Sequence, residues 1–228
     1  MGQARFAPDS AQIADAQTCR MKCARPLPRL PVSPMATDEQ NGWRTRTSRP
    51  PRHLSLQQAT SSYRGRVEFP VPRELTLDEI PGIVADFAQA TRNAREAGFD
   101  GVELHGANGY LQDQFLQDGS NRRTDAYGGS IEHRARLMLE TAKAMIDAWS
   151  ADRVGVRLSP SSYLYGVGDS NKLETFGFVV RALDALQVGY LCLLEPNAKD
   201  AERGVQINNV AETFRPMISV PIIVDKSV

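Results

Sequence analysis

From about residue 66 to residue 224, segments with helical spacing alternate with short apolar runs, and this alternation limits the chain to few folds. The first helical segment starts at the capping pattern Thr76–Glu79, has Pro81 in its first turn and ends at Gly98. Ser130 can cap the next one. Apolar residues three and four positions apart predict these helices. Further helices are expected around residues 131–149, 178–186 and 210–214.

The runs between the helices have the composition of buried strands. Strands that helices cover on both sides are apolar along most of their length. Short connections between helix and strand favour βα units around a parallel sheet, an α/β fold. A (β/α)8 TIM barrel has eight such units, so about four units make half of such a barrel or a smaller open sheet. The four expected strands are residues 99–105, 153–158, 190–195 and 220–224.

Residues 1–65 differ from the rest of the chain. They contain seven of the 14 prolines and ten basic residues against four acidic ones, a local charge of +6 that the remaining chain balances. They show no helical or strand period, and such a composition buries too little apolar surface to offset the entropy of ordering. We therefore predict a disordered leader at 1–65 and one folded domain at 66–228. A transit peptide and a basic tail are the alternatives.

Composition also bounds the class of protein. No run of about 18 apolar residues is present, so no membrane span is expected. Three cysteines cannot build a disulfide framework, which favours a reducing compartment, and we predict a cytoplasmic protein. Cys19 and Cys23 lack a second ligand pair at zinc-site spacing. The zero net charge argues against a nucleic-acid partner.

Polar residues follow the strand expected at 99–105. His105, Asn108 and Tyr110 place an imidazole, a carboxamide and a phenol within six residues. In parallel βα folds, functional groups gather where strands end. His105 and Asn108 can both donate hydrogen bonds to a carbonyl oxygen, and Tyr110 keeps its proton at neutral pH and can deliver it. A loop whose polar groups only satisfy the backbone is the alternative.

Arg157 lies inside the next apolar strand. A charge there is costly unless it meets an anion or another electron-rich group, so Arg157 is a candidate for charge stabilisation. An ion pair with Glu195 or Glu103 explains it nearly as well. Glu195 itself can add a carboxylate to the rim. The segment 118–130, with its Gly128-Gly129 pair, is expected to form a long, glycine-hinged loop over the site.

Together these stretches resemble the old yellow enzyme family, the FMN-dependent NAD(P)H:flavin oxidoreductases and ene-reductases. The match covers roughly residues 66–224, and a combination of this length is highly specific. The segments that carry it are Gly98–Tyr110, Asp118–Ser130, Ile131–Arg136, Arg153–Pro160 and Leu194–Pro196.

The resemblance implies a (β/α)8 barrel with FMN at its C-terminal face, reduced by NAD(P)H and passing hydride to an activated alkene of the enone type. His105 and Asn108 match the pair that binds the activating carbonyl group. Tyr110 matches the proton donor, and Arg157 matches the arginine beside the flavin ring, where a positive charge stabilises the anionic reduced form.

The resemblance is partial. The four expected strands match the fourth to seventh of the barrel, and residues 1–65 show no match to the first three. The eighth strand, which in this family carries a phosphate-binding arginine, also has no match here. Two alternatives to an active enzyme follow: a truncated, non-catalytic remnant that does not retain FMN, and an interaction protein that uses its basic segment. Half a barrel leaves open sheet edges and predicts association.

Overall fold

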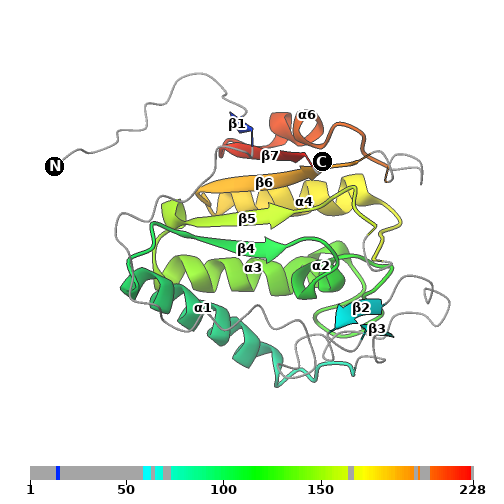
Figure 1. Ribbon diagram of the computed structural model, residues 1–228, viewed down its shortest axis with the longest axis horizontal. Coiled ribbons are helices and arrows are strands. Elements are labelled where there is room, and N and C mark those ends of the chain that lie inside the picture. Colours follow the sequence, from blue (N-terminus) through cyan, green and yellow to red (C-terminus); the bar gives the residue numbers. More distant parts are fainter. Residues whose placement is uncertain are drawn as a thin grey trace.

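The computed structural model describes residues 73–163, 167–197, 200 and 206–226 in full, and the backbone of three short strands at 14–15, 59–62 and 65–68. Its centre is a parallel sheet of five strands in the order β1-β7-β6-β5-β4 (Figure 1). The four main strands confirm the expected ones within a few residues. They are β4 (Val102–Gly106), β5 (Val154–Leu158), β6 (Tyr190–Glu195) and β7 (Ile222–Lys226).

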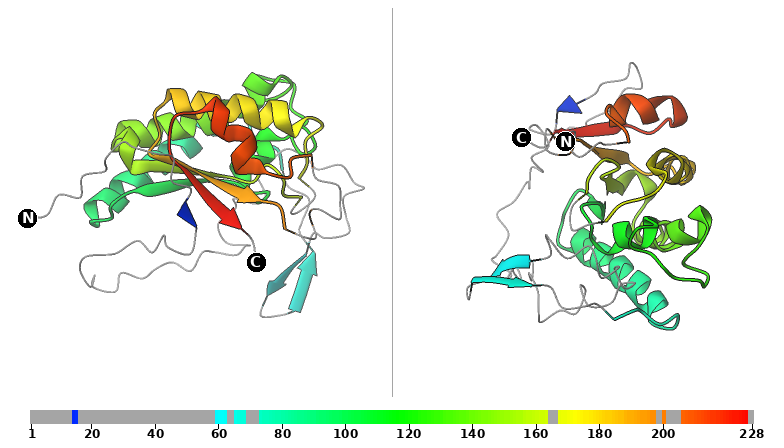
Figure 2. Two further views of the ribbon diagram at one scale, coloured as in Figure 1. Left: turned by 90° about the horizontal axis from the view of Figure 1, so that it is seen from above. Right: turned by 90° about the vertical axis from the view of Figure 1, so that its right-hand side faces the viewer.

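The helices of the described chain lie on one face of this sheet, and the other face carries none of them (Figure 2). This is the arrangement of a barrel wall, in which helices form the outer layer and the opposite face lines the interior. The expected α/β partial barrel is therefore confirmed. The helices are α1 (Ile80–Glu96), α2 (Leu111–Leu116), α3 (Ile131–Ala148), α4 (Lys172–Ala185) and α6 (Val210–Phe214).

The ends of α1 follow the sequence signals. Glu79 reaches back to the backbone N–H of Thr76 at 2.8 Å, and the helix proper begins at Ile80, just before Pro81. At the other end Gly98 has φ +84°, and the N–H of Phe99 donates to the carbonyl of Ala94, which is the Schellman pattern. Phe99 thus belongs to the cap rather than to the strand, and β4 begins at Val102.

Ser130 caps α3 as predicted, since its side chain accepts the N–H of His133. The helix α4 begins earlier than the apolar spacing indicated, because Asn171 caps it by accepting the N–H of Glu174 at 3.2 Å. Between these helices and the sheet lies one continuous core, whose members include Leu104, Met138, Val156, Val179, Leu193 and Phe214.

Two further elements differ from expectation. The segment after β4 contains the short helix α2, which is not among the helices expected from the apolar spacing, and its Phe115 and Leu116 are fully buried. The strands β1 (Ala14–Asp15) and β2 (Ala59–Ser62) lie within 1–65, where the sequence shows no strand period; β1 pairs with β7, and β2 with β3 (Gly65–Glu68). The rest of 1–65 lies outside the described residues, and its disorder stays a prediction.

Candidate active site

The strand register places two predicted site residues, His105 and Arg157, in one row with Cys192. His105 on β4 pairs with Arg157 on β5, and Arg157 pairs with Cys192 on β6. Paired residues of neighbouring parallel strands point to the same side of a sheet. Their strand neighbours Leu104, Val156 and Leu193 belong to the core under the helices, so this row lies on the opposite face. It is close to the carboxyl ends of the strands, where ligands bind in parallel βα folds.

Asn108 belongs to a tight turn directly after β4. Asn108 and Gly109 have φ values of 58° and 72°, and the N–H of Tyr110 donates to the carbonyl of Ala107 at 3.2 Å. Two successive left-handed residues are typical of a turn that favours Asn-Gly, because Asn tolerates this conformation and Gly has no Cβ. Among the described residues, no group hydrogen-bonds the buried side-chain oxygen of Asn108. The turn sets the direction of the following residue, Tyr110.

The rings of His105 and Tyr110 meet edge to face, with 5.1 Å between their centroids. Burial lowers the pKa of His105, and the charge of Arg157 lowers it further. The imidazole is consequently neutral at pH 7 and can donate one hydrogen bond. The structure thus brings together the two residues that the sequence singled out for carbonyl binding and proton delivery.

A buried acid that sequence reasoning missed holds this turn. Asp113 on α2 accepts the N–H of Gly109 at 2.9 Å and the side-chain amide of Gln117 at 2.6 Å, and it also bonds Ser159. Ser159 in turn accepts the N–H of Asn108 at 2.7 Å. Burial raises the pKa of Asp113 to about 6. The only sequence signal was an acid on a segment that is not among the helices expected from the apolar spacing.

Arg157 does form an ion pair, the alternative considered above, but its partner is Asp225 of β7 and not Glu103 or Glu195. A second nitrogen of the guanidinium lies 3.3 Å from the sulfur of Cys192. Burial works against the charge of Arg157, but the bond to Asp225 and the nearby acids outweigh it and raise the pKa of Arg157. The side chains of Arg157 and Asp225 are 22% and 21% exposed, so the pair stays within reach of a ligand.

Glu195 does not contribute to the rim as predicted. Its two carboxylate oxygens accept the N–H groups of Val210 and Ala211 at 2.8 and 2.9 Å. These are the first residues of α6, whose free N–H groups a carboxylate satisfies well. Glu195 is therefore a helix cap.

The segment 118–130 is a loop, as predicted, but it is packed against the rest of the chain. Arg123 is buried, donates to the carbonyl of Leu75 at 2.7 Å and pairs with Asp125 at 2.5 Å. A Cβ at Gly128 would lie 2.2 Å from the carbonyl oxygen of Arg123, so this glycine permits close packing. These contacts fix the position of Arg123 and of the backbone at Gly128.

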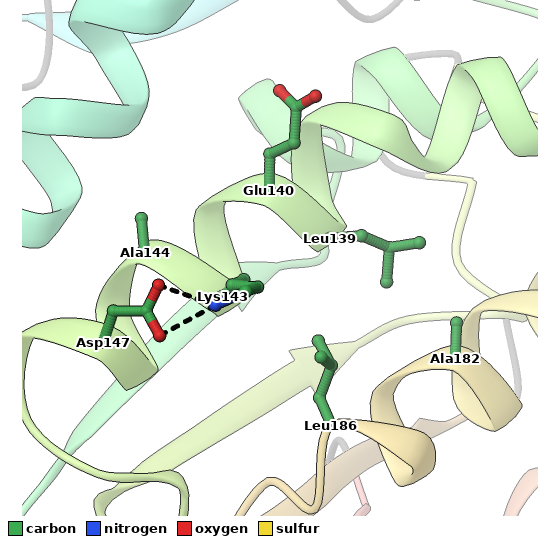
Figure 3. Close-up of a pocket in the computed structure, with 7 residues that line it drawn as sticks. All are labelled: Leu139, Glu140, Lys143, Ala144, Asp147, Ala182 and Leu186. Atoms are coloured by element: carbon green, nitrogen blue, oxygen red, sulfur yellow. Dashed lines mark hydrogen bonds and ion pairs between the residues drawn. The ribbon is translucent and has the colours of Figure 1, made fainter.

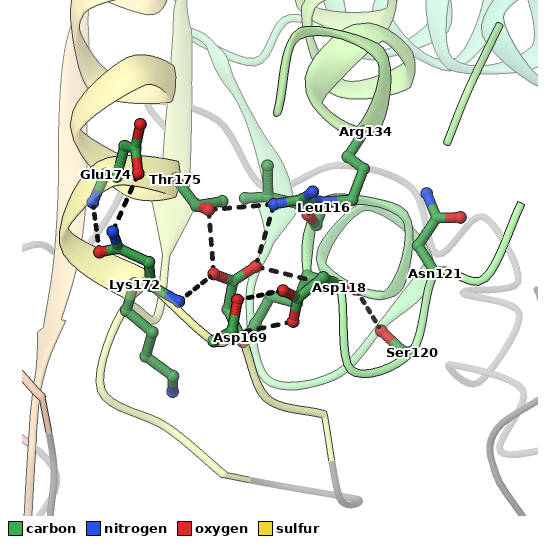
Figure 4. A network of polar contacts seen from close by, with 12 residues as sticks. Leu116, Asp118, Ser120, Asn121, Arg134, Asp169, Lys172, Glu174 and Thr175 are labelled. Carbon is green, nitrogen blue, oxygen red and sulfur yellow. Dashed lines mark hydrogen bonds and ion pairs between the residues drawn. The ribbon is translucent and has the colours of Figure 1, made fainter. Parts of the chain in front are cut away.

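Another Arg–Asp pair, Arg134–Asp169, joins three elements (Figure 4). Arg134 of α3 donates to the carbonyls of Leu116 and Gly129 at 2.8 and 2.6 Å, and it lies 3.4 Å from Asp169. Asp169 also accepts the N–H of Asp118 and the hydroxyl of Thr175, each at 3.0 Å. This network fixes the loop and the start of α4, and it is buried.

A groove between α3 and α4 lies on the helical side, away from the row of His105 and Arg157 (Figure 3). The exposed pair Lys143–Asp147 borders it, together with Leu139 and Leu186. No helix within the described ranges is long and apolar enough to cross a membrane. Across the same part of the chain, no group of three or more His, Cys, Asp or Glu side chains could hold a metal ion.

Comparison with known proteins decides the family. The model of the NADH:flavin oxidoreductase / NADH oxidase family matches residues 34–223. This chain belongs to that family. The match begins inside the predicted leader, so the likeness extends further toward the N-terminus than the motifs indicated. The predicted boundary at residue 65 itself stays a prediction.

Curated relatives and solved structures agree with this assignment. The chain is 45% identical to 12-oxophytodienoate reductase 2 of Arabidopsis thaliana over 149 residues, which are 65% of this chain and 39% of that protein. It is 43% identical to flavin oxidoreductase hxnT of Emericella nidulans over 155 residues, 64% of this chain and 40% of that protein. The chain thus spans less than half the length of these relatives.

Two solved structures confirm the fold. An old yellow enzyme homologue from Zymomonas mobilis is similar with a TM-score of 0.71 and 33% identity, over 81% of this chain and 50% of that one. Morphinone reductase gives a TM-score of 0.65 and 38% identity, over 73% of this chain and 45% of that one. The old yellow enzyme resemblance expected from the motifs is therefore confirmed.

Proposed function

We propose that this protein is an FMN-dependent oxidoreductase that uses NAD(P)H to reduce the activated C=C bond of α,β-unsaturated carbonyl compounds. The observation that carries the proposal is the edge contact of His105 and Tyr110, in register with the cation of Arg157 on the open sheet face. A hydrogen-bond donor, a proton donor and a cation are the groups that this reaction needs.

The described residues fit the ring of FMN. Arg157 offers a partly exposed positive charge beside a neutral imidazole, an environment that favours an electron-rich aromatic ligand. When bound, FMN would supply the hydride chemistry, taking a hydride from NAD(P)H and giving it to the β-carbon of the alkene. Arg157 would hold the ring and favour its anionic reduced form.

The residues of the turn after β4 would act on the substrate. His105 and Asn108 would donate hydrogen bonds to the carbonyl oxygen, which withdraws electrons from the C=C bond. Tyr110 would deliver its phenolic proton to the α-carbon, since a phenol with a pKa near ~10 keeps that proton at pH 7. Asp113 and Ser159 hold the backbone that presents these groups.

Separate measurement of the two half-reactions tests this assignment. Under anaerobic conditions, NAD(P)H should bleach the flavin absorbance of the purified protein, and an enone should restore it. Tyr110→Phe should slow the second step by about 10²–10⁴-fold, the range of a general acid, and leave bleaching unchanged. Equal loss of both steps would contradict the role of Tyr110.

The alternative of a non-catalytic remnant has a distinct outcome in the same experiment. A folded protein that stays colourless after incubation with FMN would exclude the activity for this chain. Circular dichroism at the same concentration separates that outcome from failure to fold. Yellow protein that NAD(P)H does not bleach would support the flavin site but contradict NAD(P)H as the electron donor.

A further inference from the structure

The carboxylate of Asp225 stands on the open face next to the cation that the proposed function uses. Asp225 is in register with Leu194 on β6 and lies near the end of β7. Its side chain reaches past β6 to Arg157 on β5, where it bonds the guanidinium. The proposed flavin would therefore meet an arginine that already has an anionic partner.

Among the other described titratable groups that face Arg157, Glu103 adds a negative charge at longer range, and Asp225 is the carboxylate bonded to the guanidinium. Burial raises the pKa of Cys192 on β6 to about 11, so its thiol is neutral at pH 7. His105 on β4 is neutral as well, because burial and Arg157 lower its pKa. Glu103 on β4 acts on Arg157 through charge alone, since it makes no hydrogen bond with it in the described structure.

We propose that Asp225 is a positioning residue and a built-in counter-charge for Arg157. It aims the guanidinium across the carboxyl end of the sheet and cancels part of the positive charge offered to a ligand. The ligand beside Arg157 is taken from the proposed function: an FMN ring, which gains negative charge on reduction. The charge balance between Asp225, Arg157 and His105 is a property of the folded chain and does not depend on that occupant.

Two effects follow from removing the negative charge while keeping the shape. In Asp225→Asn the amide oxygen can still accept a hydrogen bond from Arg157, but the cation is no longer balanced. The stronger field at His105 disfavours the imidazolium, so the pKa of His105 should fall further. FMN should bind about tenfold more tightly, and its reduction potential should rise, because an uncompensated cation favours the anionic reduced form.

The pKa of His105 is measured by NMR titration of the flavin-free protein, with the signal assigned from His105→Gln. Asp225→Asn should shift the midpoint downward, and Asp225→Glu should keep it near the wild-type value. Asp147→Asn, which removes an equal charge from the exposed surface of α3, is the matched control and should leave it unchanged. A midpoint that stays the same in folded Asp225→Asn would overturn the inference.

The flavin measurements then separate this inference from the proposed function. If neither wild type nor variant binds FMN and the midpoint still falls, the proposed function fails and the counter-charge stands. If both bind FMN with equal affinity and potential, the counter-charge role toward flavin is wrong and the flavin site stands. Tighter binding and a raised potential in Asp225→Asn alone would support both.

Discussion

Two Arg–Asp pairs lie near the carboxyl ends of the strands, and they differ in what surrounds them. Arg134 and Asp169 are 9% and 1% exposed, and they bond backbone groups from several segments as well as each other. Arg157 and Asp225 are 22% and 21% exposed and lie on the open face. The first pair joins elements, whereas the second leaves its charge accessible.

The difference shows why the same pair of residue types can serve stability in one place and chemistry in another. A buried ion whose hydrogen bonds are all made has no free group to offer a ligand. Its removal leaves its partners buried and unpaired, which is costly. A pair at the edge of solvent contributes little to folding, so its charge can be used for binding. Four predictions test this contrast.

The largest effect is expected from breaking the buried pair. Arg134→Met should lower the free energy of unfolding by about 3–5 kcal/mol, because it leaves Asp169 charged and without its cation. The matched change Arg157→Met should cost under about 1 kcal/mol, since water reaches that site. Urea titration followed by circular dichroism measures both. Similar losses in the two variants would remove the distinction between the pairs.

A pH effect is expected from Asp113, which is buried against the turn after β4. Its pKa is about 6 in the folded chain against an ordinary value of 3.8. The folded state therefore binds more protons between these values, and the free energy of unfolding should fall as pH rises from about 4 to about 6, by up to about 3 kcal/mol. The difference between wild type and Asp113→Asn isolates this slope. A difference that does not vary with pH would contradict it.

A smaller effect is expected at the turn that carries Asn108. Ser159→Ala removes the acceptor of the Asn108 N–H and should lower stability by about 1–3 kcal/mol. It should also weaken enone binding in the flavin-loaded protein, because the turn that presents Asn108 loosens. Ser162→Ala, a change of the same type a few residues later, is the control and should keep enone affinity. An equal loss of enone affinity in both variants would contradict the role of this turn in substrate binding.

The smallest effect is expected at the surface. The pair Lys143–Asp147 on α3 is 61% exposed on both sides. Asp147→Asn should change the free energy of unfolding by under about 0.5 kcal/mol, since solvent screens such a pair. A loss above 1 kcal/mol in urea titration would show that exposure does not separate structural from accessible ion pairs here.

The sequence predicted the main strands and helices because their apolar spacing and caps are local. It missed α2, whose segment Leu111–Leu116 mixes polar residues with Phe115 and has no strong capping residue before it. It missed the packing of the loop 118–130 because the partners of Arg123 include Leu75, distant in sequence. Long-range backbone acceptors leave no local pattern.

The part of the candidate site that lies on a single segment of the chain was predictable from the sequence. His105, Asn108 and Tyr110 follow a single strand, so the strand-end rule and the family resemblance find them together. The sequence offered an ion pair as one reading of Arg157, with Glu103 and Glu195 as examples, but the choice of Asp225 depends on strand order and side-chain reach. Spacing along the chain does not contain that information. The catalytic roles of these residues stay predictions.

The proposed function requires that FMN bind on the open sheet face beside His105 and Arg157. NMR spectra of the histidine side chains during FMN titration test it most directly, because His133 lies at the start of α3 on the helical side and serves as an internal control. We expect FMN to shift the ring signals of His105 and to leave those of His133 unchanged. Equal shifts of both, or no shift of His105 in folded protein, would contradict it.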